Sequence, residues 1–204
     1  MSDPRTHAAD TPAPGPGSAP GPAPVWQVRP ERQGEREAVR RVNLAAFETA
    51  EEADLVDALR EDPEAWLPGL SYVAVSAPGA LAGPLGEPVP EPGEGGDGNE
   101  NGGEVAGFAL LTRCHVGDVP ALALAPCAVL PAHQGRGAGS AAIRGALDAA
   151  REAGERTVIV LGHPAYYPRF GFTPCARFGI TPPSGQEWPD EAFLALSLDG
   201  GVMP

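Results

Sequence analysis

The sequence has no apolar run long enough to span a membrane. No stretch approaches the roughly 20 consecutive apolar residues that a transmembrane helix needs. The N-terminus also lacks a basic segment followed by an apolar one, which is the pattern of a secretory signal. These absences argue against a membrane partner, and we expect a cytoplasmic location.

Cysteine is scarce, because the chain contains only Cys114, Cys127 and Cys175. The number is odd and the spacing matches no metal-binding pattern, which argues against a disulfide framework and a zinc site. Free cysteines are usually buried as small apolar side chains. We therefore expect three reduced thiols and no bound metal.

Positive charge is in deficit. The chain has 14 lysine and arginine residues against 27 aspartate and glutamate residues, which gives a net charge of −13 and a pI near 4.6. A surface of this sign repels the phosphates of DNA and RNA, so we expect no nucleic-acid partner. A small anion is not excluded, because converging backbone N–H groups can bind phosphate in an acidic protein.

Two segments lack the large apolar side chains that a core requires. Residues 11–24 read TPAPGPGSAPGPAP, so we predict a disordered tail over residues 1–25. A second segment, at about 77–103, is rich in glycine, proline and glutamate. It separates two strand-like runs, Ser71–Ser76 and Glu104–Thr112, and therefore reads as an enlarged hairpin loop. The remainder, residues 26–200, is predicted to form one domain.

Apolar periodicity predicts helices alternating with strands. Helices are expected at 31–47, 50–60 and 139–153, with a short one at 165–170. Further strands are expected at 122–130, 157–161 and 193–198. Hairpins followed by a β-α-β unit indicate the α/β class, with a mixed sheet covered by helices on both faces.

The segment Ala128–Ser140, AVLPAHQGRGAGS, predicts a strand, a glycine-rich turn and a helix start. Successive glycines let backbone N–H groups converge, and a helix N-terminus adds partial positive charge, so the turn suits a pyrophosphate. The spacing fits neither a dinucleotide-binding G-x-G-x-x-G fingerprint nor a P-loop. A tight connection that binds nothing is the alternative.

The Gln134–Gly139 turn resembles the Q/R-x-x-G-x-G/A motif of the GCN5-related N-acetyltransferase (GNAT) superfamily, and Leu161–Phe172 (LGHPAYYPRFGF) is similar to a second block of that superfamily. The resemblance implies a splayed mixed sheet with acetyl-coenzyme A wedged between two strands. It also implies that Tyr167 protonates the departing thiolate. The implied donor-binding residues are Cys127, Ala128 and Val129 for the pantetheine arm, and Gln134, Gly135, Arg136, Gly137, Ala138 and Gly139 for the pyrophosphate.

Several other polar residues leave alternative roles open. His163 follows a strand end, where it could help to deprotonate an amine or could cap the next helix. His115 and Asp118 read as a solvated turn, with substrate contact as the alternative. The acidic residues between the first two helices could attract a cationic amine or simply end a helix; they are Glu48, Glu51 and Glu52. His133 adjoins the turn and has no assigned task.

These observations lead to one main functional hypothesis. We expect an acetyl-coenzyme A-dependent N-acetyltransferase in which the amine attacks the thioester directly. The acceptor stays open between a small-molecule amine, a peptide amine and a lysine side chain, and a homodimer is a possible assembly. The alternatives are a non-catalytic acyl-coenzyme A-binding regulatory module and a nucleotide-binding module that uses the same turn.

Overall fold

The computed structural model describes residues 26–76 and 103–204. The predicted tail (1–25) and nearly all of the predicted insertion lie outside the described residues. The described strands are β1 (Trp26–Pro30), β2 (Ser71–Ser76), β3 (Val105–Val116), β4 (Val119–Val129), β5 (Thr157–Leu161), β6 (Thr173–Pro174) and β7 (Phe193–Ser197). The helices are α1 (Arg36–Ala46), α2 (Glu51–Glu61) and α3 (Ala138–Glu152), with short 3-10 segments η1 (Gln33–Glu35), η2 (Pro131–His133), η3 (Tyr167–Phe170) and η4 (Cys175–Phe178).

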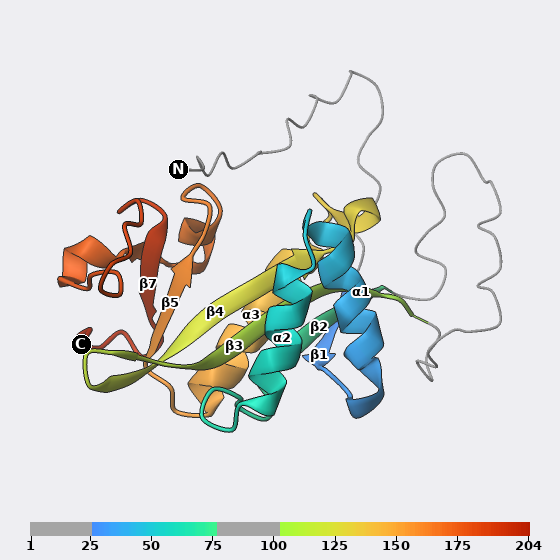
Figure 1. Ribbon diagram of the computed structural model, residues 1–204, viewed down its shortest axis with the longest axis horizontal. Coiled ribbons are helices and arrows are strands. Elements are labelled where there is room, and N and C mark those ends of the chain that lie inside the picture. The colour runs from blue at the N-terminus through green and yellow to red at the C-terminus, as the bar shows by residue number, and fades with distance from the viewer. Residues whose placement is uncertain (1–25, 77–102) are drawn as a thin grey trace, which may run out of the picture.

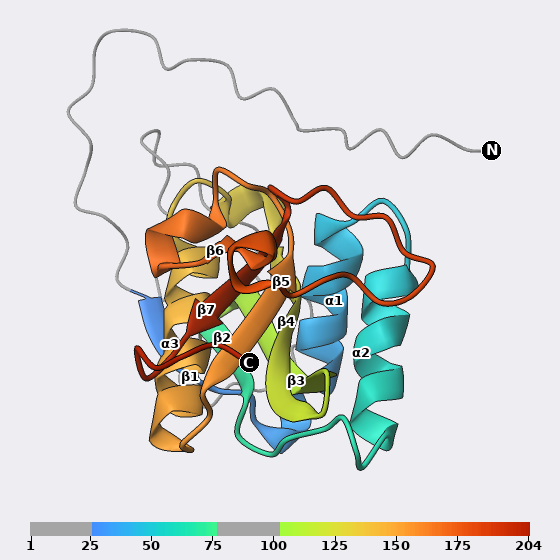
Figure 2. The ribbon, with the colours of Figure 1, turned by 90° about the vertical axis from the view of Figure 1, so that its left-hand side faces the viewer.

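One mixed sheet runs through the domain in the order β1-β2-β3-β4-β5-β7-β6. Helix α3 covers one face, and α1 and α2 cover the other (Figures 1 and 2). Helix α3 can pack closely because small side chains, Ala142, Ala146 and Ala150, form much of its buried stripe. The predicted α/β class, with helices on both faces, is confirmed.

The sheet is splayed between β4 and β5. These strands are parallel and pair only at Leu122↔Val158 and Ala123↔Ile159. Strand β4 nevertheless continues to Val129, where its other edge still pairs with β3 through Gly107↔Val129. The last residues of β4 therefore have a strand on one side and a gap on the other.

Several predicted elements have different bounds in the structure. The first helix begins at Arg36 rather than Glu31, because the Glu35 carboxylate accepts the Arg32 N–H (2.9 Å) and pairs with Arg29. These contacts hold the residues before Arg36 in the connection between β1 and α1, so they do not join the helix. The predicted short helix at 165–170 is the 3-10 segment η3, in which Pro168 has no N–H to donate. Strands β1 and β6 were not predicted.

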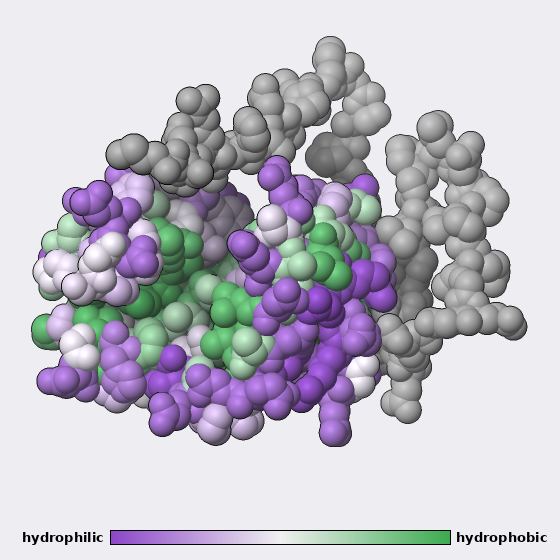
Figure 3. All heavy atoms as spheres, viewed as in Figure 1, coloured by the Kyte–Doolittle hydropathy of each residue, from purple (hydrophilic) through white to green (hydrophobic). Residues whose placement is uncertain are grey.

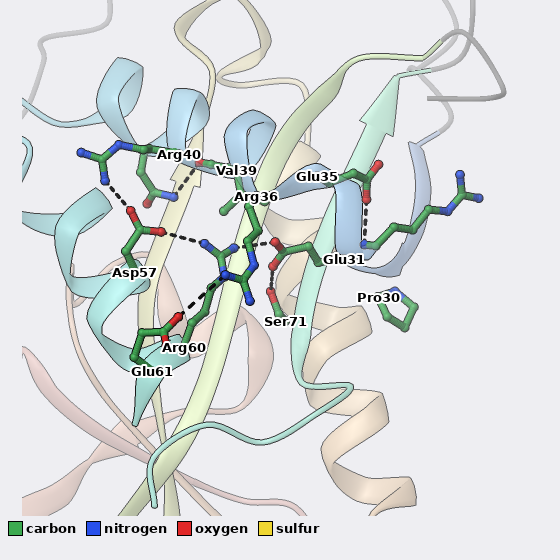
Figure 4. Close-up of polar contacts among 12 residues, drawn as sticks. Pro30, Glu31, Glu35, Arg36, Val39, Arg40, Asp57, Arg60, Glu61 and Ser71 are labelled. Atoms are coloured by element: carbon green, nitrogen blue, oxygen red, sulfur yellow. Dashed lines mark hydrogen bonds and ion pairs between the residues drawn. The ribbon is translucent and has the colours of Figure 1, made fainter. Parts of the chain in front are cut away.

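An ion-pair network ties α1 and α2 to the β1–β2 side of the sheet (Figure 4). The Arg60 guanidinium on α2 forms ion pairs with both Asp57 and Glu31. The Glu31 carboxylate also accepts a hydrogen bond from the Ser71 hydroxyl. Arg60 and Glu31 are almost fully buried, with side-chain exposures of 2% and 7%.

No helix among the described residues is long and apolar enough to cross a bilayer.

Candidate active site

The glycine turn connects β4 to α3 through two backbone conformations that favour glycine. Gly135 has φ = 70° and Gly137 has φ = 91°, in the left-handed region that side chains disfavour. Helix α3 then begins at Ala138, and its first hydrogen bond runs from the Ala141 N–H to the Gly137 carbonyl (2.9 Å). The N–H groups of residues 138–140 therefore have no acceptor within the helix and give this end a partial positive charge.

Two further glycines bring the start of α3 close to its neighbours. A Cβ on Gly107 of β3 would lie 3.0 Å from the Ala138 carbonyl carbon. A Cβ on Gly139 would lie 2.8 Å from Val129 Cγ2 and 3.4 Å from the Tyr166 hydroxyl. Glycine at these two positions thus lets the helix N-terminus lie directly against β3 and the end of β4.

The turn is held from outside by contacts that the sequence did not suggest. Trp26 of β1 donates its indole N–H to the Arg136 carbonyl (2.9 Å). His133 is 2% exposed, and its Nε2 lies 3.1 Å from a Glu104 carboxylate oxygen. The His133 and Trp26 rings meet edge to face with centroids 5.4 Å apart. His133 thus fixes the turn, a role that was missed because its partners lie far away in the sequence.

Backbone groups at the end of β4 face the gap in the sheet. The Leu130 N–H donates to the Ala106 carbonyl on the β3 side (2.9 Å). Because successive residues of a strand point their backbone groups to opposite sides, Ala128 also faces β3, whereas Cys127 and Val129 face away from it. The Val129 carbonyl, consistently, accepts a long hydrogen bond from the Gln134 side chain (3.5 Å). The N–H and C=O groups of Cys127 and Val129 are therefore directed into the gap.

The helix start and the end of β4 border a common cavity of about 480 Å³. Its walls come from the loop after α1, the end of β4, the glycine turn with the start of α3, and the segment that follows β5. The lining residues are Ala46, Phe47, Cys127, Val129, His133, Gln134, Gly135, Gly137, Ala138, Gly139, Ser140, Ile143, His163, Tyr166, Tyr167 and Arg169. All the residues predicted to bind the acetyl donor line this cavity, except Ala128 and Arg136.

Tyr167 lies in this cavity beside Cys127, with which it forms a side-chain hydrogen bond. Removal from water and the neighbouring thiol raise the pKa of Tyr167 above its ordinary value. The phenol therefore keeps its proton throughout the physiological pH range. Removal from water likewise raises the pKa of Cys127 to about 12, although the Tyr167 hydrogen bond acts in the opposite direction.

Comparison with known proteins agrees with this geometry. Residues 87–172, which include β3, β4, α3, β5 and η3, match the model of the acetyltransferase (GNAT) family. The chain is 37% identical over 142 residues to the uncharacterized N-acetyltransferase YjhQ of Escherichia coli (strain K12). The chain belongs to the acetyltransferase (GNAT) family. The match to YjhQ covers 68% of this chain and 64% of that relative's length.

Solved structures of GNAT proteins share the fold. The GNAT family N-acetyltransferase YhbS from Escherichia coli, in complex with CoA, superposes with a TM-score of 0.66 at 25% identity, covering 89% of this chain and 86% of that chain. A GNAT family acetyltransferase from Brucella melitensis, in complex with acetyl-CoA, gives a TM-score of 0.61 at 28% identity, covering 88% and 92%. Both likenesses extend well beyond the glycine turn.

In this GNAT chain, two neighbours of Tyr167 have defined hydrogen bonds. His163 accepts the Ala165 N–H at Nδ1 (3.3 Å), so it caps the following turn, as one of its two predicted roles required. Nδ1 of His163 is therefore occupied as a hydrogen-bond acceptor. The Tyr166 hydroxyl lies 3.2 Å from Ser140 Oγ in the first turn of α3.

The other polar residues considered from the sequence do not line the cavity. His115 is the next-to-last residue of β3, and Asp118 lies in the turn between β3 and β4. Glu48, Glu51 and Glu52 follow the lining residue Phe47 without lining the cavity themselves. Within residues 26–76 and 103–204, no group of three or more histidine, cysteine or acidic side chains is placed to hold a metal ion.

Proposed function

We propose that this GNAT chain transfers the acetyl group of acetyl-coenzyme A to an amine by direct attack on the thioester. The observation that carries the proposal is the meeting of three features in one cavity. They are a helix N-terminus with unpaired N–H groups, the open edge of β4, and the protonated hydroxyl of Tyr167. The fold likeness to GNAT structures in complex with CoA and acetyl-CoA supports the choice of donor.

The donor would lie along the gap between β4 and β5. Its pyrophosphate would accept hydrogen bonds from the backbone N–H groups of residues 135–139, where the α3 dipole favours negative charge. Its pantetheine amides would pair with the outward-facing groups of Cys127 and Val129 like an added strand. The Gln134 side chain bonds the Val129 carbonyl and so connects the two halves of the site.

The chemical step needs a stabilised oxyanion and a proton for sulfur. A neutral amine attacks the thioester carbonyl carbon, and the Val129 N–H donates to the oxygen as it becomes negative. The C–N bond forms and the C–S bond breaks, with Tyr167 supplying its proton to the leaving sulfur. The proton lost from nitrogen returns to the phenolate through water, so the enzyme ends unchanged.

The acceptor would approach from the face that carries α1 and α2. That face is hollowed between α2 and β5–β7, and apolar side chains line the hollow (Figure 3). Leu55 of α2 and Leu161 at the end of β5 are exposed apolar residues on these elements. A small-molecule amine, a peptide amine and a lysine side chain all remain acceptor candidates, and the net charge of −13 favours one that carries positive charge.

Thermal unfolding tests the donor assignment. Acetyl-coenzyme A at a hundredfold excess over its dissociation constant should stabilise the fold by about 2.7 kcal/mol, which is a shift of roughly 5–10 °C for a domain of this size. ATP and NAD, tested in parallel, should give no comparable shift. No shift with millimolar coenzyme A would contradict the proposal, and a shift with ATP or NAD would indicate a nucleotide-binding module.

A Tyr167→Phe variant tests turnover. It should bind acetyl-coenzyme A like the wild type and acetylate an accepted amine at least about a hundredfold more slowly, the lower range for loss of a general acid. Tyr72→Phe is the matched control, because Tyr72 packs against Gly145 of α3 outside the cavity. Donor binding without acetylation of any amine in a broad panel would instead indicate a non-catalytic acyl-coenzyme A-binding module.

A further inference from the structure

The positive charges of this chain are all arginines, because the sequence contains no lysine. Seven described arginines are neutralised by carboxylates, namely Arg29, Arg36, Arg40, Arg60, Arg113, Arg151 and Arg156. Within residues 26–76 and 103–204, Arg136, Arg144, Arg169 and Arg177 pair with no carboxylate. These four guanidinium groups are therefore not neutralised within the described part of the chain and could pair with an anion supplied from outside.

Two of these arginines lie on neighbouring elements, Arg144 on α3 and Arg169 on η3. Arg169 lines the cavity. Arg144 lies four residues after Ser140 on α3, on the same face of the helix and about 6 Å further along its axis. Because Ser140 also lines the cavity, this helix face leads directly from the cavity to Arg144.

Aromatic rings hold both guanidinium groups in place. The Arg169 guanidinium carbon lies 4.4 Å from the centroid of Tyr166, and that of Arg144 lies 5.2 Å from the centroid of Phe170. The two rings contact each other with centroids 5.6 Å apart. A contact with a ring does not use up the N–H groups of a guanidinium, so both arginines can still donate to an oxyanion.

We propose that Arg144 and Arg169 bind the 3′-phosphate of coenzyme A, so that the protein discriminates between coenzyme A and its 3′-dephospho form. The proposal rests on the proposed function, because it assumes that the pyrophosphate occupies the helix start. The only other phosphate of coenzyme A is then the 3′-phosphate, which is joined to the pyrophosphate through one ribose. A phosphate monoester carries nearly two negative charges at neutral pH and suits planar guanidinium donors.

The test compares coenzyme A with 3′-dephospho-coenzyme A by isothermal titration calorimetry. The wild type should bind coenzyme A at least about tenfold more tightly, since charge-assisted hydrogen bonds contribute on that scale. The double variant Arg144→Gln/Arg169→Gln should bind coenzyme A only as tightly as it binds the dephospho form. Its affinity for the dephospho form should stay within about twofold of the wild-type value. Arg177→Gln is the matched control, because this unpaired arginine lies on η4 and does not line the cavity.

Each other outcome overturns the inference in a recognisable way. If the wild type binds both compounds equally, or if the double variant keeps the preference, the arginines do not read the 3′-phosphate and the proposed function stands. If the double variant loses affinity for both compounds equally, the arginines either contact the pyrophosphate or stabilise the fold, and they do not recognise the 3′-phosphate. If the wild type binds neither compound, the proposed function and this inference fail together.

Discussion

The Cys127 thiol lies beside Tyr167 in the cavity, so a covalent route through an acetylated cysteine is a chemical alternative to direct attack. The protonation state of this thiol decides between them, because only the thiolate is an effective nucleophile. With a pKa of about 12, Cys127 is a thiolate in roughly 3 of 100,000 molecules at pH 7.5, against about one in ten for an ordinary cysteine. We therefore expect Cys127 to react about three orders of magnitude more slowly than an unperturbed thiol.

The assay is labelling with Ellman's reagent at pH 7.5, in native protein and in protein unfolded by guanidinium. All three thiols should react quickly after unfolding and slowly in the native state, because burial also raises the pKa of Cys114 to about 11 and that of Cys175 to about 12. Native protein mixed with acetyl-coenzyme A alone should gain no acetyl group in its intact mass. A fast native phase that disappears in Cys127→Ala, together with an acetyl adduct on Cys127, would refute the argument for direct attack.

Three further predictions concern the parts of the fold that support the site. Gly107→Ala should lower the free energy of unfolding by about 1–3 kcal/mol in urea titrations, because its Cβ would press on the backbone of Ala138. Arg60→Met should cost about 3–5 kcal/mol in the same assay, since it leaves the buried Glu31 carboxylate without its cation. Burial alone would raise the pKa of Glu35, but the contacts with Arg29 and Arg32 together outweigh burial, so the net pKa is below 4.5. Stability from Glu35 is therefore present above pH 4.5 and lost as the pH falls through the folded pKa, and Glu35→Gln should flatten that part of the profile.

Each prediction has a matched control within the chain. Gly34→Ala should have little effect, because an added Cβ there meets nothing within 4 Å. Arg36→Gln removes an ion pair whose side chains are 59% and 79% exposed, so it should change stability by less than about 1 kcal/mol. Glu37→Gln, at an exposed position of α1, should leave the acid profile unchanged. Losses in the controls equal to those in the test variants would show that the assigned contacts are not the cause.

Local sequence signals were sufficient where an element depends on its own residues. Strand β2 has the predicted bounds, Ser71–Ser76, because its alternating apolar side chains are buried in the sheet. Helix α3 follows the glycine turn as predicted, because a positive φ at Gly137 ends the turn and an apolar stripe begins directly after it. The residues that we propose for donor binding come mainly from this contiguous segment, so the sequence alone was enough to propose them.

Local signals failed where an element depends on distant partners. Strand β1 is short and ends in proline, and it exists because it pairs with β2 from Trp26↔Ser76 to Pro30↔Tyr72. The contact of Trp26 with the glycine turn spans 110 residues, and that of His133 with Glu104 spans 29. Neither contact has a periodicity or spacing that a sequence window could detect.

An acidic chain can bind an anionic donor when the local charge at the binding site differs from the net charge of the chain. The ligand responds to the local electric field at the cavity. Elsewhere in the fold, most arginines are paired with carboxylates, as Arg40 is with Asp54 and Arg113 is with Glu155. The arginines near the helix start are stacked on aromatic rings instead, as Arg169 is on Tyr166. Their charge therefore adds to that of the helix N-terminus. Net charge is thus a poor guide to ligand charge here, because the sign that the ligand meets depends on which cations lack a carboxylate partner.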